Sequence, residues 1–318
     1  MVQVWLIAFG AGAASALLVA SVSTGTTLAL PLFYLAPLPI LIVGLGWSQI
    51  AALVAGSAAA VALGLGFGLE LMLAYVAGVG LPAYVLAYLA LMARQETPDG
   101  PLLWFPVGRI VLAAAVLGCL AVAALIPLVA GSFEDYQAAL RSLFQTMLSA
   151  DPATPADADT ARLIDLLVTV MPPAAALITM VTQIVNLWIA AHVARMSGRL
   201  MRPWPDLASI SLPQASVALL AGAFLGSALA SGFIGLVCEL LGATLVMALA
   251  FVGLATLHWI TRGAGGRTLV LGTVWIAALV LGWPFALLAL LGAVETLFGI
   301  RRRFPRGGPG VPPAANEA

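Results

Sequence analysis

The fold of this chain is decided by residues 4–69, which read VWLIAFGAGAASALLVASVSTGTTLALPLFYLAPLPILIVGLGWSQIAALVAGSAAAVALGLGFGL. Glu70 is the first charged residue, and no histidine precedes it. A single membrane-spanning helix needs about 20 apolar residues, so a stretch of this length holds several. We expect three consecutive spans here, at 4–22, 27–46 and 49–67.

The rest of the chain has the same character. It has 318 residues, of which 63% are hydrophobic and 8% are charged, and its mean hydropathy is +1.11. A soluble domain carries roughly 25% charged residues, and this chain has too few to cover a water-exposed surface. A membrane β-barrel would alternate apolar and polar residues, whereas these apolar runs are continuous. The composition predicts an all-α, polytopic transmembrane helical bundle.

The number of spans depends on residues 268–299, an apolar run of 32 residues. One helix of that length would be about 48 Å long, too long for a hydrocarbon core of about 30 Å. Pro284 lies at the middle of the run and breaks a helix there, so we divide the run into two short spans. The ten predicted spans are 4–22, 27–46, 49–67, 69–93, 107–130, 166–193, 213–231, 234–260, 268–282 and 284–299.

The arginines support this count and give an orientation. Loops rich in Lys and Arg stay in the cytoplasm, and all thirteen basic residues here are Arg. With ten spans and both termini inside, only Arg141 and Arg162 fall on the outer side. We treat 1–303 as one membrane-embedded domain and expect 304–318 to be a disordered cytoplasmic tail. The outer segment 131–165 should hold an amphipathic helix in 131–150.

Several kinds of chemistry are excluded by missing residues. The chain has no Lys, so it has neither a P-loop nor a Schiff-base lysine. Cys119 and Cys238 have no disulfide or metal spacing, and we find no set of nucleophile, base and orienting group. The sequence therefore predicts no enzyme activity, no catalytic residue, no cofactor, no metal site and no nucleic-acid partner.

Three glutamates fall within or at the edge of predicted spans, where an ionisable group is costly and suggests function. Glu70 opens the fourth span and has the alternative of lying at the interface. Glu295 lies near the end of the tenth span and has the alternative of pairing with an Arg of the tail or of the 261–267 loop. Glu239 lies among apolar neighbours two turns into the eighth span and is the strongest candidate.

The sixth span carries polar side chains at helical spacing: Thr179, Thr182, Gln183 and Asn186. Amides at membrane depth must be hydrogen-bonded. Either they line a substrate cavity or they join helices. As substrate-binding residues we select Glu239, Glu70, Gln183 and Asn186, and we expect Glu239 and Asn186 to face one cavity.

Prolines and small residues add two expectations. Pro172-Pro173 should break the outer third of the sixth span, and Pro37-Leu38-Pro39 should break the second. Irregular backbone at membrane depth lines a cavity or is buried in protein. Gly10 and Ala14 give the first span a small-residue face that another helix can approach, either within this chain or in a membrane protein partner.

Three of these features together resemble a known family. They are 37–40 leading to 44–47, the outer amphipathic segment before a Pro-containing span with Asn186, and the ending 290–295 followed by Arg301–Arg303. The chain resembles the YybS-like family of predicted bacterial membrane proteins (domain of unknown function 2232). That family is distantly similar to the substrate-binding S components of energy-coupling-factor transporters. The resemblance implies a multi-pass protein of the bacterial plasma membrane.

Two functions remain open at this point. The first is small-molecule binding or transport, which would need a partner ATPase or an ion gradient because the chain has no P-loop. The alternative is a non-transporting envelope scaffold or assembly factor, with 131–165 and the Arg-rich inner loops as partner surfaces.

Overall fold

The computed structural model describes residues 2–97, 100–148 and 157–303, and within them the chain is almost entirely helical. The tail expected at 304–318 lies outside these residues, as do 149–156 of the outer segment. The longer helices are α1 (Val2–Ala20), α3 (Pro37–Gly46), α4 (Gln49–Phe67), α6 (Leu81–Leu91), α7 (Val107–Ala130), α8 (Phe133–Leu148), α9 (Ala158–Met196), α10 (Ala215–Leu229), α11 (Gly232–Ile260), α12 (Arg267–Leu281) and α13 (Pro284–Phe298). Short helices are α2 (Ala29–Tyr34) and α5 (Leu69–Tyr75).

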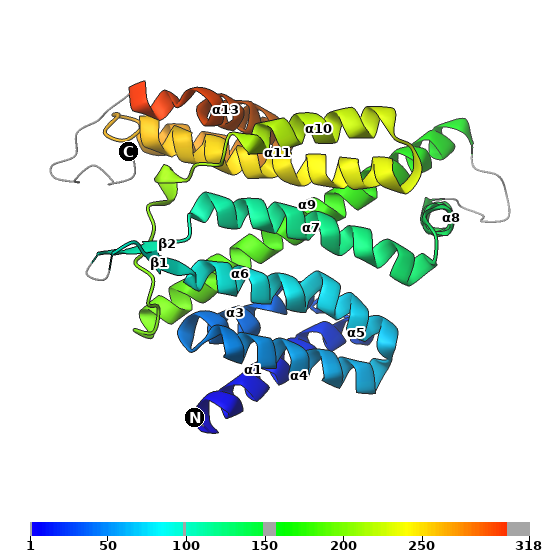
Figure 1. Cartoon of the computed structure of the whole chain (residues 1–318). Helices are drawn as coiled ribbons and strands as arrows, with labels where there is room; N and C mark the ends of the chain where they lie inside the picture. The colour runs from blue at the N-terminus through cyan, green and yellow to red at the C-terminus, as the bar shows by residue number, and fades with distance from the viewer. Residues whose placement is uncertain (1, 98–99, 149–156, 304–318) are drawn as a thin grey trace.

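The helices form one bundle in three layers (Figure 1). α1, α3, α4 and α5 make one side, α6, α7 and α9 run through the middle, and α10, α11 and α13 make the other side. Within the described residues, seven helical segments are long and apolar enough to cross a membrane, and α10, α12 and α13 are shorter apolar helices. The structure confirms an all-α polytopic bundle.

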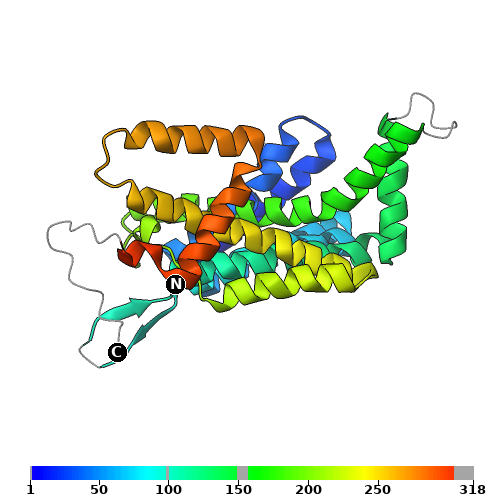
Figure 2. The same ribbon diagram turned by 90° about the horizontal axis from the view of Figure 1, so that it is seen from above.

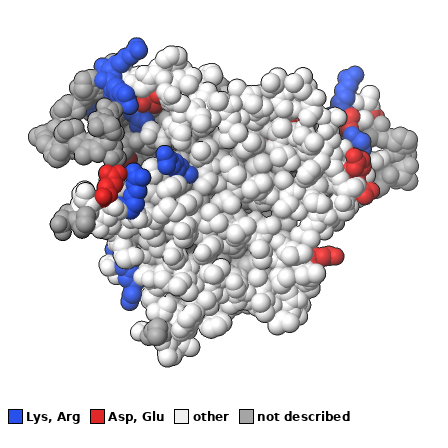
Figure 3. Space-filling view, viewed as in Figure 1, with Lys and Arg blue, Asp and Glu red and all other residues white. Residues whose placement is uncertain are grey.

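Charged side chains gather at the two ends of the bundle (Figure 3). We call the end with the two-stranded hairpin β1 (Ala93–Gln95) and β2 (Leu102–Trp104) the inner end, and the end with α8 the outer end. The face between them is nearly free of charge, as expected of a surface in contact with lipid. The hairpin was not predicted, and the amphipathic helix expected in 131–150 is present as α8.

Prolines set some helix ends but not others. The second span is divided between α2 and α3 just before Pro37, and the last run is divided between α12 and α13 at Pro284, both as predicted. The break predicted at Pro172-Pro173 is wrong, because α9 continues through both prolines. Neighbouring helices can compensate for the backbone donors that a proline removes.

α12 is set apart from the other helices. Figure 2 shows it beside the bundle rather than within it, and Ala278 is its one buried residue. α13 instead packs closely on α11, where Gly253 and Gly292 face one another. A Cβ on Gly292 would overlap the Leu249 carbonyl, so only glycine permits this approach.

Candidate functional site: a buried polar cluster

Two side-chain amides of α9 lie in the middle of the bundle. Gln183 and Asn186 are each 2% exposed. They are three residues apart, which puts them on one face of the helix. Thr179, on the same face, is half-buried and donates only to the Ala175 carbonyl of its own helix, at 2.8 Å. The two amides therefore differ from their neighbour in reaching other helices.

Asn186 compensates for the break between α2 and α3. Pro37 and Pro39 have no N–H, and the Leu38 N–H bonds to the Leu35 carbonyl three residues back. The carbonyl of Tyr34 is left without its usual helical donor. Asn186 Nδ2 donates to that carbonyl at 2.8 Å and to the Thr182 carbonyl at 2.8 Å.

Gln183 supplies a donor to an open backbone carbonyl at a second helix interruption, between α5 and α6. Residues Val76–Gly80, between α5 and α6, form one turn of π-helix, and Pro82 follows. Pro82 has no N–H to donate to the carbonyl four residues back, which is that of Gly78. Gln183 Nε2 donates to the Gly78 carbonyl at 3.1 Å. A π-turn of this kind is frequent at functional sites.

Two hydroxyls complete the cluster. Ser15 of α1 and Tyr75 of α5 are 0% and 2% exposed, and their oxygens lie 2.8 Å apart. Ser15 Oγ donates to the Ala36 carbonyl at 2.7 Å, so the Tyr75 hydroxyl must donate to Ser15. We call Ser15, Tyr75, Gln183 and Asn186 the buried polar cluster.

Two oxygens of this cluster have no hydrogen-bond partner among the described residues. Gln183 Oε1 and Asn186 Oδ1 are both buried and unpaired. Most buried polar atoms in proteins are hydrogen-bonded, so each exception needs a water, an ion or a function to explain it. Sequence reasoning found both amides but missed Ser15 and Tyr75, because a serine among alanines and a tyrosine in an apolar helix give no clear signal.

The glutamates selected from the sequence lie elsewhere. Glu70 is exposed in the first turn of α5, where the helix dipole favours an acid. Glu239 is half-buried on α11 and has no hydrogen bond or ion pair to another described residue. Two contacts of α7 relate the position of Glu239 to α9: Cys119 Sγ donates to the Val237 carbonyl at 3.7 Å, and a Cβ on the preceding Gly118 would lie 2.8 Å from the Ala176 carbonyl. Ala176 lies ten residues before Asn186 and so about 15 Å away along α9. The structure does not bring Glu239 and Asn186 to one cavity.

A second polar assembly holds the inner end together. Glu295 is 7% exposed and accepts from Arg301 Nε at 2.8 Å and from the Arg301 backbone N–H at 3.0 Å. The same guanidinium donates to the Ala208 and Ile210 carbonyls at 2.7 and 2.8 Å. Glu295 therefore pairs with an Arg that follows α13, and pairing with an Arg was the predicted alternative to a functional role.

Asp206 extends this assembly. Arg262 Nη2 lies 2.7 and 2.8 Å from the two Asp206 carboxylate oxygens. Burial alone would raise the pKa of Asp206, but hydrogen bonds from Arg262 and from the Ala208 N–H, with the charges of Arg262 and Arg301, outweigh burial and hold the pKa below its usual range. We call Glu295, Arg301, Asp206 and Arg262 the inner ion-pair cluster.

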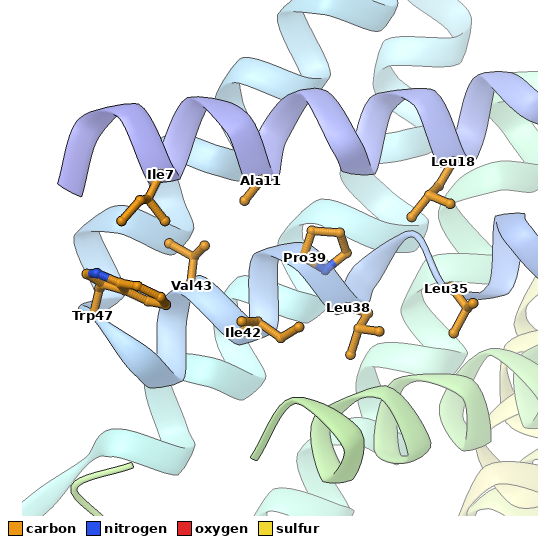
Figure 4. Close-up of a pocket in the computed structure, with 9 residues that line it drawn as sticks. All are labelled: Ile7, Ala11, Leu18, Leu35, Leu38, Pro39, Ile42, Val43 and Trp47. Carbon is orange, nitrogen blue, oxygen red and sulfur yellow. The ribbon is translucent and has the colours of Figure 1, made fainter. Parts of the chain in front are cut away.

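Two cavities border these assemblies. A groove of about 380 Å³ lies between α1 and α3, and Figure 4 shows the side chains that line it. Leu35, Leu38 and Pro39 of the α2–α3 break line this groove, and every other lining residue is apolar. A polar cavity of about 680 Å³ lies at the inner end and is lined in part by Glu295, Arg301 and Trp259.

The first helix packs through a different small residue from those selected. Gly12 faces α4 so closely that a Cβ would lie 2.6 Å from the Ala55 carbonyl. Gly10 is exposed with nothing within 4 Å of where its Cβ would be, and Ala14 is half-buried. The contact within the chain thus uses Gly12.

These features define a multi-pass helical membrane protein with a buried polar centre. A family model described as predicted membrane protein (DUF2232) matches residues 13–295. The chain belongs to this family. Searches of curated proteins and of solved structures each found no match.

Proposed function

We propose that this protein binds a small molecule within the bacterial plasma membrane, as the substrate-binding component of a transport system. The observation that carries the proposal is that two interrupted helices meet at one buried polar cluster. In transporters, binding sites near the bilayer midplane are typically formed by discontinuous helices. The proposal assigns no reaction to the chain.

The α1–α3 groove suggests the kind of molecule. Its volume of about 380 Å³ lies within the usual range of small-molecule sites, about 300–1,000 Å³. Its walls are apolar, and the break that supplies Tyr34 and Ala36 carbonyls to the cluster also supplies Leu35 and Leu38 to the groove. A solute with a substantial apolar part suits such walls.

Transport would require energy from outside the chain. A chain without Lys has no P-loop, so a partner ATPase or an ion gradient must supply it. The resemblance to S components that we drew from the sequence would favour a partner. We propose the outward face of α1 around Gly10 and Ala14 as its docking position, because small residues allow a second helix to approach.

Ligand-induced thermal stabilisation of the full chain in lipid nanodiscs tests the proposal. Melting is followed by tryptophan fluorescence across vitamins, nucleobases and other small solutes. We expect at least one compound to raise the melting temperature of the wild type and of Thr179→Val, but not of Asn186→Leu. If no compound acts and the inner loops or 131–165 crosslink to a stable protein partner, the chain is a scaffold and the proposal is wrong.

A further inference from the structure

Five of the six polar hydrogens on the side chains of the buried polar cluster are already donated, four of them to backbone carbonyls. Both N–H groups of Asn186 Nδ2 are used, by Tyr34 and by Thr182. Carbonyl oxygens only accept, so these two bonds fix which end of the amide is nitrogen. Asn186 Oδ1 is therefore the end without a partner.

The hydroxyls follow the same pattern. The Ser15 hydrogen goes to the Ala36 carbonyl and the Tyr75 hydrogen goes to Ser15 Oγ. Gln183 uses one N–H on Gly78, and its Oε1 is unpaired. On the four side chains, only the second N–H of Gln183 has no acceptor among the described residues, while oxygen lone pairs remain on all of them. The cluster can accept but hardly donate.

We propose that the buried polar cluster binds a monovalent cation through the unpaired oxygens of Gln183 and Asn186. The two side chains are neighbours on α9, with about 5–6 Å between Cβ atoms. Hard cations take oxygen ligands such as amide carbonyls. Among the described residues, no Asp or Glu is hydrogen-bonded to the cluster, so it carries no negative charge to balance a divalent ion.

A buried water is the simplest competitor. Waters in protein interiors usually make about three hydrogen bonds. A water here would donate to both oxygens but would find only the second N–H of Gln183 as a donor. A cation uses lone pairs alone, and it needs no donor from the protein. Metal-site motifs are recognised by the spacing of His, Cys, Asp or Glu. A site built from neutral amide oxygens has no such motif, so the lack of one in the sequence does not exclude it.

The inference deepens the proposed function, on which it rests for the role of the cation in transport. Binding of the cation itself can be measured without a solute. The full chain in zwitterionic nanodiscs is melted at constant ionic strength while N-methylglucamine chloride is replaced by NaCl, KCl or LiCl. We expect at least one of these salts to raise the melting temperature by several degrees in a saturable manner.

Three variants locate the effect. Asn186→Leu should abolish it, and Thr179→Val, on the same helix face, should keep it. Asn186→Asp preserves the size of the side chain and adds a charge, but it loses both N–H donors to the Tyr34 and Thr182 carbonyls and so melts lower without cation. The half-saturating cation concentration of the folded variant should still fall about tenfold or more, as one close charge would produce. An equal melting temperature in all four salts overturns the inference in favour of water. A cation effect that both Asn186 variants leave unchanged places the ion elsewhere and also overturns it.

The solute screen separates the two proposals. A cation effect without any solute effect contradicts the proposed function and leaves the cation site standing. A solute effect in the wild type, together with an equal solute-free melting temperature in all four salts, contradicts the cation site alone.

Discussion

The buried polar cluster and the inner ion-pair cluster show two ways of placing polar groups in an apolar bundle. The inner cluster uses full charges, and both Glu295 oxygens and all three guanidinium nitrogens of Arg301 have partners. The buried polar cluster uses neutral groups and leaves two oxygens unpaired. A site completed by the protein itself serves stability, whereas a site that still lacks a partner is suited to a ligand.

The two clusters also differ in which parts of the fold they connect. Arg301 joins the end of α13 to the loop before α10 and so closes the last helix onto the bundle. Gln183 and Asn186 reach carbonyls that interrupted helices leave open, where the backbone is already irregular. The comparison predicts that substitutions in the inner ion-pair cluster cause large losses of stability. Substitutions in the buried polar cluster should cause smaller losses of stability, together with loss of the response to ligand.

Removing Arg301 should have the largest effect. Arg301→Leu leaves Glu295 buried without its partner, and breaking a buried pair costs about 3–5 kcal/mol. Unfolding of the full chain in mixed micelles by SDS titration measures the loss. The control is Arg303→Leu, because Arg303 is exposed. Equal midpoints for the two variants would show that the inner cluster does not hold α13 in place.

Asn186→Leu should cost less. It leaves the Tyr34 carbonyl without a donor, at about 1–3 kcal/mol, but it also removes the unpaired Oδ1, which offsets part of that cost. The same SDS titration measures it against Thr179→Val, whose hydroxyl bonds only within α9. If Asn186→Leu lowered the stability more than Arg301→Leu, the buried polar cluster would contribute more to stability than the inner ion-pair cluster, contrary to this account.

The hydrogen bond between Ser15 and Tyr75 should contribute a smaller amount. A double-mutant cycle of Ser15→Ala and Tyr75→Phe should give a coupling of about 0.5–1.5 kcal/mol, typical of one net hydrogen bond. Full additivity would mean that the 2.8 Å contact adds nothing to stability.

The smallest expected effect is the pH dependence from Asp206. Its folded pKa lies below the unfolded value near 4, so its contribution is complete above about pH 4 and is lost as pH falls through the folded pKa. Because the pair with Arg262 is partly exposed, with side chains 39% and 48% exposed, we expect at most about 1 kcal/mol. Between pH 6 and pH 3, the melting temperature of Asp206→Asn should fall less than that of the wild type. Equal falls in the two proteins would contradict this.

Much of the fold was predictable because its signals are local. Apolar length, Pro37 and Pro284 gave the helix ends, and amphipathic spacing gave α8. The π-turn before Pro82 and the continuity of α9 through Pro172-Pro173 were not predicted. At the π-turn the Gly78 carbonyl takes its donor from Gln183 of another helix, which no local pattern signals. The number of spans that cross the bilayer and the orientation stay predictions.

The site was only half predictable. Amides in an apolar helix are conspicuous, so Gln183 and Asn186 were found. Their partners are backbone carbonyls, which carry no residue identity, and Ser15 and Tyr75 matter only through the neighbours that folding supplies. The rule that charge in a membrane marks function also raised Glu295 as a candidate, but Glu295 pairs with Arg301, which was the alternative given for it.

The central claim is that the buried polar cluster binds ligand while the inner ion-pair cluster holds the fold. Its most direct test compares ligand-induced melting shifts, by cation or solute, in wild type, Asn186→Leu and Glu295→Gln. The account predicts that Glu295→Gln melts at a lower temperature but keeps the full shift, and that Asn186→Leu loses the shift. A shift that survives in Asn186→Leu, or disappears in Glu295→Gln while that variant remains folded, would contradict it.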